Sequence, residues 1–292
     1  MRIMKKHVLT IAVILFLLAG LSLLLYPTLS DQWNSQHQSK AIAGYTEAVA
    51  TLSDDDYARY WADALAYNQD LPRNQARFFP TAEELEAYKG LLNISGNDIM
   101  GYLEIPRIGC LLPIYHGTDE AVLQIAVGHI VGTSLPVGGK GTHCVLSGHR
   151  GLPSAKLFTN LDLLSEGDWF MLHVLNETLV YQVDQILTVL PEEIEALDID
   201  ADADYCTLVT CTPYGVNTHR LLVRGHRIAY EEAQEMALPT AEVQSLPSRC
   251  GPWLFIGVIA LLTVFVGIVR RRKKEDAAQV KQGCTRIISN LI

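Results

Sequence analysis

Three short stretches of the sequence carry residue types that suit covalent catalysis at a carbonyl group. One holds a histidine in a glycine-flanked turn, the second a cysteine just before a proline, and the third an arginine at the start of an apolar run. A cysteine thiolate is a strong nucleophile, a nearby histidine serves as acid and base, and an arginine stabilises developing negative charge. The stretches are 147–151 with His149, 207–213 with Cys211 and 217–225 with Arg220.

Spacing alone leaves other interpretations of these cysteines and arginines open. A buried cysteine more often fills space in a core, and Cys110, Cys144 and Cys206 are expected to be strand residues of that kind. Arg224 lies four residues after Arg220, so in a strand both side chains face the same side. The residue types therefore indicate a nucleophile but do not by themselves choose it.

The neighbouring histidines suit ordinary surface or core positions, and this applies to His143, His219 and His226. A zinc site built from Cys206, Cys211 and His219 would need compact ligand spacing, which Cys-x4-Cys without a second pair does not supply. Neither a metal nor another cofactor is therefore expected.

Five stretches of the sequence resemble the sortase family, and within it the class C, pilus-assembling sortases. The most specific are GHRGLPSAKLF at 148–158 and TCTPYGVNTHRLLVRGHR at 210–227. GTSLPVGGKGTH at 132–143, MGYLEIPRI at 100–108 and SDQWNSQHQSKAI at 30–42 are similar too. The resemblance covers roughly residues 30–230 and favours Cys211 as the nucleophile.

The resemblance implies a transpeptidase that acts on a Leu-Pro-x-Thr-Gly-like sorting signal. By the residue match, Cys211 would attack the Thr carbonyl, His149 would exchange protons with the two amines, and Arg220 would stabilise the oxyanion. In a pilus-assembling sortase the accepting amine is a Lys of the next pilin subunit. Thr210 and Thr212 are candidate substrate-contacting residues, although Thr210 also suits a plain strand position.

From Met100 onward the pattern is one of short apolar or alternating runs separated by turn residues, which predicts an all-β fold. The sortase resemblance specifies a closed β-barrel. The clearest predicted strands are 101–106, 143–147, 169–174, 178–190, 205–210 and 219–228.

The segment before residue 100 is predicted to be helical. Ile42, Tyr45, Val49 and Leu52 recur at helical spacing within 38–68. Ser53 caps a second helix, and Thr81 with Glu84 forms a capping-box pattern that opens a short third one through Lys89.

Two uncharged runs, 8–26 and 253–269, are each near the length that crosses a membrane as a helix. Basic residues precede the first run and follow the second, which predicts two membrane-spanning helices, cytoplasmic termini and an extracellular catalytic domain. The alternative for the first run, a cleaved secretory signal, would have a shorter apolar segment. Residues 31–250 hold 30 acidic and 13 basic side chains, so nucleic acid is not an expected partner.

These observations divide the chain into six predicted parts. They are a cytoplasmic tail and anchor (1–29), an extracellular helical extension with a lid region (30–98), the catalytic barrel (99–230), a linker (231–250), a second membrane helix (251–270) and a basic cytoplasmic tail (271–292).

One departure from the resemblance concerns a lid over the cleft. Class C sortases usually anchor such a lid with Asp-Pro-aromatic or Asp-Ser-aromatic, and neither tripeptide lies between the helical region and Met100. Phe78, Phe79 and Pro80 lie in the corresponding stretch and are expected either to plug the cleft or to pack at the start of a helix.

Three other functions share some of these sequence features with pilin polymerisation. The first is a sortase that attaches surface proteins to a peptidoglycan amine with the same nucleophile. The second is a surface protein that is itself a sortase substrate, which would need Leu-Pro-x-Thr-Gly before the second apolar run. The nearest text there is Leu-Pro-Ser-Arg-Cys at 246–250. The third is a hydrolytic cysteine peptidase, which normally has an Asn or Asp to orient the histidine.

Overall fold

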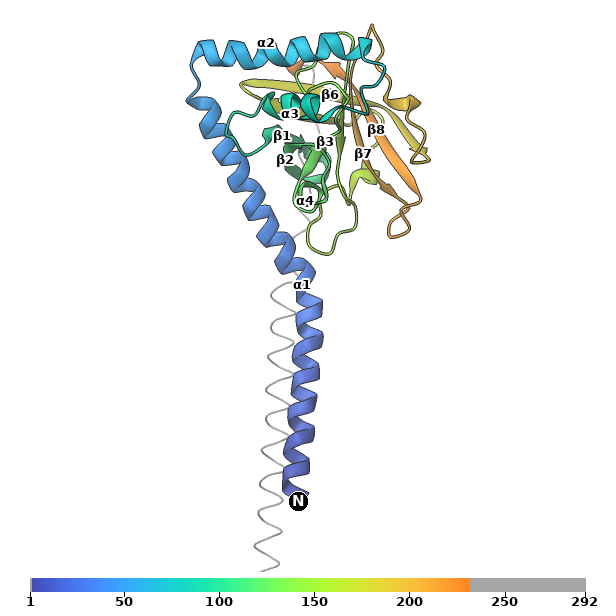
Figure 1. The fold of residues 1–292 in the computed structure, drawn as a ribbon. Helices are drawn as coiled ribbons and strands as arrows, with labels where there is room; N and C mark the ends of the chain where they lie inside the picture. The colour runs from blue at the N-terminus through green and yellow to red at the C-terminus, as the bar shows by residue number, and fades with distance from the viewer. Residues whose placement is uncertain (1, 232–292) are drawn as a thin grey trace, which may run out of the picture. The chain divides into compact units, whose positions relative to one another are not determined.

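The computed structural model describes residues 2–231, and its centre is a closed barrel of eight strands (Figure 1). The order around the barrel is β1-β2-β3-β4-β7-β8-β6-β5. The strands are β1 (Ile99–Ile105), β2 (Cys110–His116), β3 (Val127–His129), β4 (Thr142–Ser147), β5 (Trp169–Val174), β6 (Glu177–Val189), β7 (Asp204–Thr212) and β8 (His219–Ile228).

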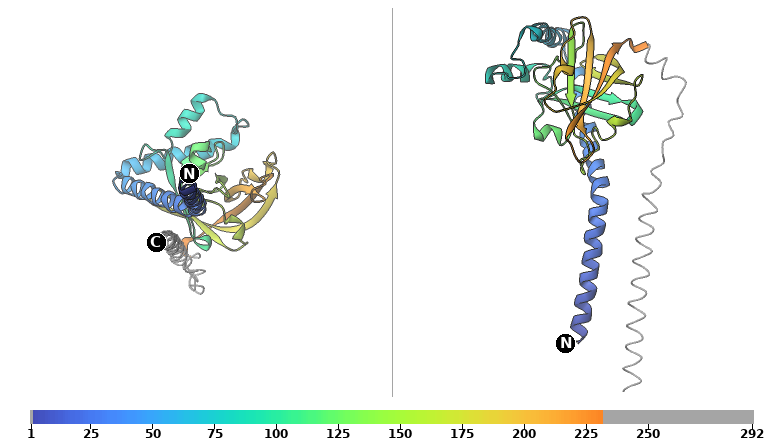
Figure 2. Two further views of the ribbon diagram at one scale, coloured as in Figure 1. Left: turned by 90° about the horizontal axis from the view of Figure 1, so that it is seen from below. Right: turned by 90° about the vertical axis from the view of Figure 1, so that its right-hand side faces the viewer.

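Two of the strand pairings are parallel, β2 with β3 and β4 with β7, and the other six are antiparallel. The β4–β7 pairing joins strands that are far apart in the sequence, and it brings residues 142–147 beside 204–209. Strands β7 and β8, in orange tones, run side by side in the views of Figure 2. The barrel wall therefore gathers β4, β7 and β8 as three consecutive neighbours.

Alternating side chains fill the barrel interior, as expected for strands with one face buried. In β7 the inward side chains are Cys206, Leu208 and Thr210, which are between 0% and 2% exposed. Cys144 of β4 pairs with Cys206 in this interior. Large buried residues such as Phe158, Phe170 and Tyr181 complete the core.

Three longer helices precede the barrel: α1 (Arg2–Ala50), α2 (Asp54–Asp70) and α3 (Ala82–Gly90). Ser53 caps α2 by accepting a hydrogen bond from the backbone N–H of Asp56. Thr81 and Glu84 form both bonds of a capping box at the start of α3. Each bond satisfies a backbone donor that a helix start leaves free, so both predicted helix starts are confirmed.

The C-terminal part of α1 is hydrogen-bonded to the barrel. The hydroxyl of the buried Tyr45 donates to the carbonyl oxygen of Met100 at 2.9 Å and accepts from the backbone N–H of Leu175 at 2.8 Å. Buried polar groups must find partners, and these two bonds join the helix to the start of β1 and the end of β5. The helix and the barrel thus share one core.

Residues 31–38 of α1 are hydrogen-bonded to two loops, one that follows β4 and one that follows α4 (Glu120–Leu123). Asp31 accepts from the backbone N–H of Lys156, and the amide of Asn34 donates to the carbonyl of Ser154 at 2.8 Å. The amide of Gln38 donates to the carbonyl of Ile125 at 2.6 Å. The segment 31–38 therefore fixes two loops next to the end of β4.

The same helix contains the first of the two predicted membrane spans. Within Ala12–Ala50 it is long and apolar enough to cross a membrane by length and composition, with a mean hydropathy of 2.3 in its most apolar window. Phe16, Leu23 and Leu29 are among its exposed apolar side chains. The second predicted span, 251–270, lies outside the described residues, as do the predicted linker beyond 231 and the basic tail.

The predicted strands agree closely with the barrel, with two omissions. Strands β5 and β8 have the predicted bounds, and β1, β4, β6 and β7 differ by one or two residues at their ends. Strands β2 and β3 were not predicted. The first contains Pro113 and the second has only three residues, so neither shows a clear alternating pattern.

Candidate active site

Cys211 is the penultimate residue of β7 and carries a free, partly buried thiol. Because side chains alternate along a strand, it faces away from the barrel interior that Cys206, Leu208 and Thr210 fill. The outer face at this end of β7 therefore presents a thiol that is neither sealed in the core nor fully exposed.

Arg220 is the cross-strand partner of Cys211 in the antiparallel β7–β8 pair. Directly opposite residues project to the same face with Cβ atoms about 4.5–5.5 Å apart, so the guanidinium and the thiol share one surface. In this structure Nη1 of Arg220 donates to the carbonyls of His219 and Asn217, at 3.1 and 3.3 Å. A guanidinium has five N–H donors, so these bonds leave others for a ligand.

His149 follows the end of β4, beside β7. The register pairs Ser147 with Val209, and the N–H of Gly148 continues the ladder by donating to the carbonyl of Val209 at 3.0 Å. Extending the same register by two residues sets His149 next to Cys211. The structure thus pairs Cys211 directly with Arg220 and places His149 in the turn that follows the neighbouring strand end.

The two threonines that flank Cys211 have different surroundings. The buried Thr210 hydroxyl donates to the carbonyl of Gly148 at 2.7 Å, so it fixes the backbone that precedes His149. The hydroxyl of Thr212 accepts from Nη1 of Arg150 at 3.5 Å. Both side chains therefore make internal contacts, and their predicted contact with substrate stays a prediction.

Both glycines of the 148–151 turn are required by close contacts. A Cβ on Gly148 would lie 2.7 Å from the ring of Phe158. A Cβ on Gly151, whose φ is +78°, would lie 2.8 Å from the ring of Tyr214. Only glycine fits such a distance and such a φ without strain. The turn that carries His149 is therefore packed tightly against its neighbours.

Arg150 links this turn to the loop after β7. Its guanidinium pairs with Asp162 at 2.5 Å and lies 5.8 Å from the centre of the Tyr214 ring. The Arg150 side chain is only 9% exposed, whereas that of Asp162 is 44% exposed, so the arginine is shielded from water and its partner is not. Asp162 is thus bound by Arg150.

Glu120, the first residue of α4, is a neighbour of His149 that no motif indicated. Its Oε2 atom lies 3.6 Å from Nε2 of His149, within ion-pair distance. Glu120 precedes His149 by 29 residues and belongs to a different element. A single sequence gives no signal that could have connected the two.

The other cysteines behave as core residues, as expected. Burial raises the pKa of the Cys110 thiol to about 12 and raises the pKa of Cys206 strongly. Cys206 faces the interior and Cys211 the outer face, so the zinc site considered with His219 has no geometric support. Among residues 2–231, no group of three or more His, Cys, Asp or Glu side chains could hold a metal ion.

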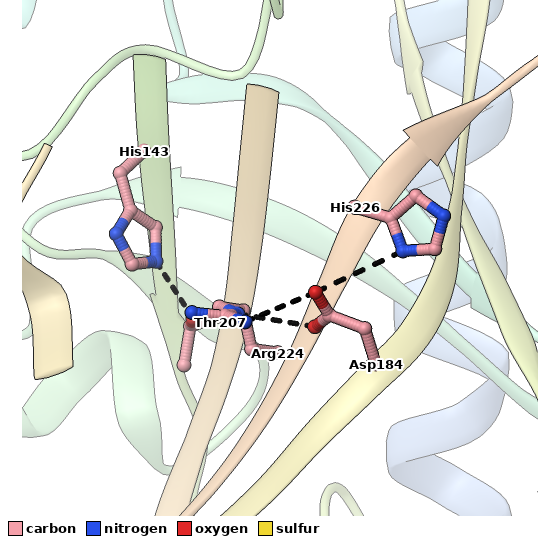
Figure 3. A network of polar contacts seen from close by, with 5 residues as sticks. All are labelled: His143, Asp184, Thr207, Arg224 and His226. Carbon is pink, nitrogen blue, oxygen red and sulfur yellow. Dashed lines mark hydrogen bonds and ion pairs between the residues drawn. The ribbon is translucent and has the colours of Figure 1, made fainter. Parts of the chain in front are cut away.

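A second polar cluster, formed by side chains of β4, β6, β7 and β8, is drawn in Figure 3. Arg224 makes two bonds of 3.0 Å to Asp184, whose carboxylate also lies 3.8 Å from Nδ1 of His226. Arg224 pairs with Thr207 in the ladder, about 13 Å along the strand from Cys211. Its bidentate partner and its position make Arg224 a structural residue, which leaves Arg220 as the arginine beside the thiol.

His143 completes this cluster as a buried histidine with internal partners. Its Nδ1–H donates to the carbonyl of Asp198 at 2.9 Å, so Nε2 accepts from the hydroxyl of Thr207 at 2.7 Å (Figure 3). Burial lowers the pKa of His143, which favours the neutral ring. The expectation that His143 is a satisfied core histidine is confirmed.

Between the two ends of this face lies a small apolar cluster of Val145, Val209 and Leu222. Ala196 and Leu197, from the segment between β6 and β7, pack on it. The same segment is held by Arg77, which pairs with Asp198 at 3.0 Å. The 190–203 segment therefore covers part of the surface that leads away from Cys211.

The aromatic pair considered as a lid has one exposed member. The Phe79 side chain is 85% exposed, so the expectation that it plugs a cleft is wrong for this structure. The Phe78 ring lies 4.7 Å below the guanidinium of Arg77, beside the contact of Arg77 with Asp198. The alternative expectation for Phe78, packing near the start of α3, stays a prediction.

Comparisons with known proteins agree on one family. A sortase-domain family model matches residues 103–228. Sortase C1 from Streptococcus agalactiae is 49% identical, with a TM-score of 0.63 over 65% of this chain and 98% of that one. Sortase C from Streptococcus pneumoniae, described with respect to catalysis and pilin substrate specificity, is 42% identical, with a TM-score of 0.58 over 65% and 97% of the two chains.

A third solved structure and the curated relatives complete the comparison. Sortase C from Clostridium perfringens, solved with the C-terminal cell wall sorting motif, is 46% identical, with a TM-score of 0.58 over 65% of this chain and 99% of that one. Curated bacterial sortases are 28–29% identical, and the chain spans between 47% and 63% of their length.

Proposed function

This chain belongs to the sortase family and shares its fold with class C sortases, and from that premise we propose that it is a membrane-anchored cysteine transpeptidase. It would cleave a Leu-Pro-x-Thr-Gly-like sorting signal and join the Thr carbonyl to a Lys amine of a pilin subunit. The observation that carries the proposal is the cross-strand pairing of Cys211 with Arg220, next to the strand end that leads into His149.

In the first half-reaction the Cys211 thiolate attacks the Thr carbonyl carbon and the C=O electron pair moves to oxygen. Arg220 stabilises this oxyanion, a role that is worth about 2.7–4 kcal/mol for a single donor. The oxyanion then collapses, the C–N bond to Gly breaks, and His149 donates its proton to the departing amine. The product is a thioester on Cys211.

In the second half-reaction a Lys amine attacks the thioester carbonyl. His149, now neutral, accepts a proton from the amine as the tetrahedral species forms. The C–S bond breaks, a new amide remains, and the Cys211 thiolate and the His149 imidazolium are restored.

The apolar stretch of α1 and the segment 31–38 that follows it are consistent with an active site close to a membrane surface. The apolar stretch of α1 precedes the segment 31–38, whose side chains bond to the loops flanking His149 and Glu120. We propose that the apolar stretch is a membrane anchor and that the barrel is extracellular. Sorting-signal proteins are themselves membrane-bound before cleavage in this scheme, so a site held close to the anchor would meet them there.

The test is an amide-transfer assay with the full-length chain in detergent. A purified pilin-like protein with a Leu-Pro-x-Thr-Gly-like signal should give a ladder of covalent oligomers on a denaturing gel. The same pilin with its acceptor Lys changed to Arg should give no ladder, because guanidinium is a poor nucleophile at neutral pH.

Two outcomes would contradict the proposal in different ways. Release of the free Thr carboxylate with no oligomer, at high pilin concentration, would indicate a hydrolase. Transfer to an amine-bearing peptidoglycan peptide but not to pilin would indicate the wall-attaching alternative.

A further inference from the structure

We infer that Glu120 is a positioning residue for His149, whose imidazole it holds in place through an ion-pair contact at Nε2. The inference deepens the proposed function and rests on it, since it concerns the acid and base of the same reaction. Its basis is the distance of 3.6 Å between Oε2 of Glu120 and Nε2 of His149. This pair adds a fourth member to the thiol, the imidazole and the Arg220 guanidinium.

The Glu120 carboxylate is itself held in place. Its Oε1 atom accepts a hydrogen bond from the Gln124 side chain at 2.5 Å, and the backbone N–H of Gln124 donates to the Glu120 carbonyl. The next residue, Ile125, accepts the hydrogen bond from Gln38 of α1. The Glu120 side chain is 72% exposed. The residues that follow α4 are nevertheless hydrogen-bonded to α1, and β3 begins soon after them in the chain.

The other charged groups around His149 leave Glu120 as its carboxylate partner. Cys211 on β7 and Arg220 on β8 present the thiol and a positive charge. Arg150, the next residue in the chain, is paired with Asp162. The imidazole is 28% exposed, which is enough for a ligand to approach and too little for free rotation in water.

This arrangement suits the proton transfers of the proposed reaction. With Nε2 facing Glu120, the other ring nitrogen, Nδ1, is available to the thiol and the amines. A carboxylate at this distance stabilises an imidazolium more than a neutral ring, so it favours the thiolate–imidazolium form of the pair. The Gln124 hydrogen bond, together with the charge of His149, lowers the pKa of Glu120, which keeps the carboxylate ionised at neutral pH.

The test compares pH profiles of kcat/KM for Glu120→Gln and the unchanged full-length chain with a sorting-signal peptide and an amine acceptor. Glutamine keeps an oxygen that can accept from Gln124, so α4 should stay in place. The substitution removes the negative charge that faces the imidazole. We expect the alkaline limb to move down by about 0.2–0.7 pH units and kcat/KM near that limb to fall about 2- to 5-fold.

Three companion variants separate this role from a general charge effect. Glu120→Asp should recover part of the shift, because the charge returns on a shorter side chain. Asp119→Asn, which removes the neighbouring charge of a residue that makes no side-chain cap bond, and Glu195→Gln, in the segment between β6 and β7, should leave the limb within about 0.1 unit.

The inference is overturned if Glu120→Gln leaves the alkaline limb unmoved, or if Asp119→Asn moves it as much. A fall in rate that is equal at every pH would also overturn it, since that pattern indicates a structural effect. If the unchanged chain neither forms a thioester nor transfers the peptide, the proposed function fails. In that case the fault lies there and not with Glu120.

Discussion

Replacing Cys211 with alanine is expected to remove all turnover of a sorting-signal peptide. No other group near the outer end of β7 can form the thioester. The loss should be on the order of 10⁴-fold or more, as when the nucleophile of a covalent catalyst is deleted. Because Cys211 is only partly buried and makes no disulfide, the variant should keep its fold. Initial rates of peptide cleavage and a thermal unfolding curve measure both parts.

A matched cysteine variant shows whether the effect belongs to this thiol. Cys110→Ala removes a buried thiol whose pKa burial has raised and whose weak hydrogen bond reaches only the Leu157 carbonyl, at 4.0 Å. It should cost some stability and leave kcat close to that of the unchanged chain. If Cys211→Ala kept as much as about a tenth of the activity, the assignment of the nucleophile would be wrong.

Replacing Arg220 with alanine is expected to lower kcat by about 10²- to 10³-fold, the range seen when one oxyanion donor is removed. Arg220 is placed for this role by its pairing with Cys211 across β7 and β8. Lysine should restore only part of the rate, because a point charge lacks the planar fork of donors. Single-turnover acylation of the full-length chain isolates the step in which the oxyanion forms.

Arg224 supplies the control for Arg220, because it lies four residues further along the same face of the same strand. Arg224→Gln should weaken the pairing with Asp184 and lower the free energy of unfolding, while kcat of the folded protein stays nearly unchanged. An equal loss of kcat in both variants would contradict the separate roles given to the two arginines.

The strands that could be predicted are those that are long and alternate clearly. Strands β5 and β8 have six and ten residues, with well-marked turns on either side. Strand β3 has three residues, and β2 has Pro113 in its centre, where the residue still pairs with Tyr102. Short or interrupted strands depend on their partners in the barrel more than on their own sequence.

The rest of the candidate site depends on contacts between segments that are far apart in the sequence. The nine-residue spacing of Cys211 and Arg220 suits two strands joined by a turn, but Arg220 was chosen over Arg224 only through the family resemblance. The parallel pairing of β4 with β7 joins segments about sixty residues apart, and a shared site for His149 and Cys211 was expected only from the family resemblance. Glu120 comes from a third region, and no local pattern connects it to either residue.

Helix α1 is also longer than the sequence indicated, because it joins two segments that were predicted to be separate. The apolar run and the helical stretch around Tyr45 were treated as separate parts, with a boundary at 29/30. One helix crosses that boundary, with Pro27 inside it. The contacts of Asp31, Asn34 and Gln38 that follow from this continuity depend on three-dimensional proximity to residues between 87 and 125 positions later in the chain.

The most direct test of the central claim is the site of the acyl intermediate. The full-length chain is mixed with a Leu-Pro-x-Thr-Gly peptide in the absence of an amine acceptor, quenched in acid and digested for mass spectrometry. We predict that the added mass is the Leu-Pro-x-Thr acyl group and that it lies on Cys211. An acyl group on Cys206, or on any residue other than Cys211, would contradict the account.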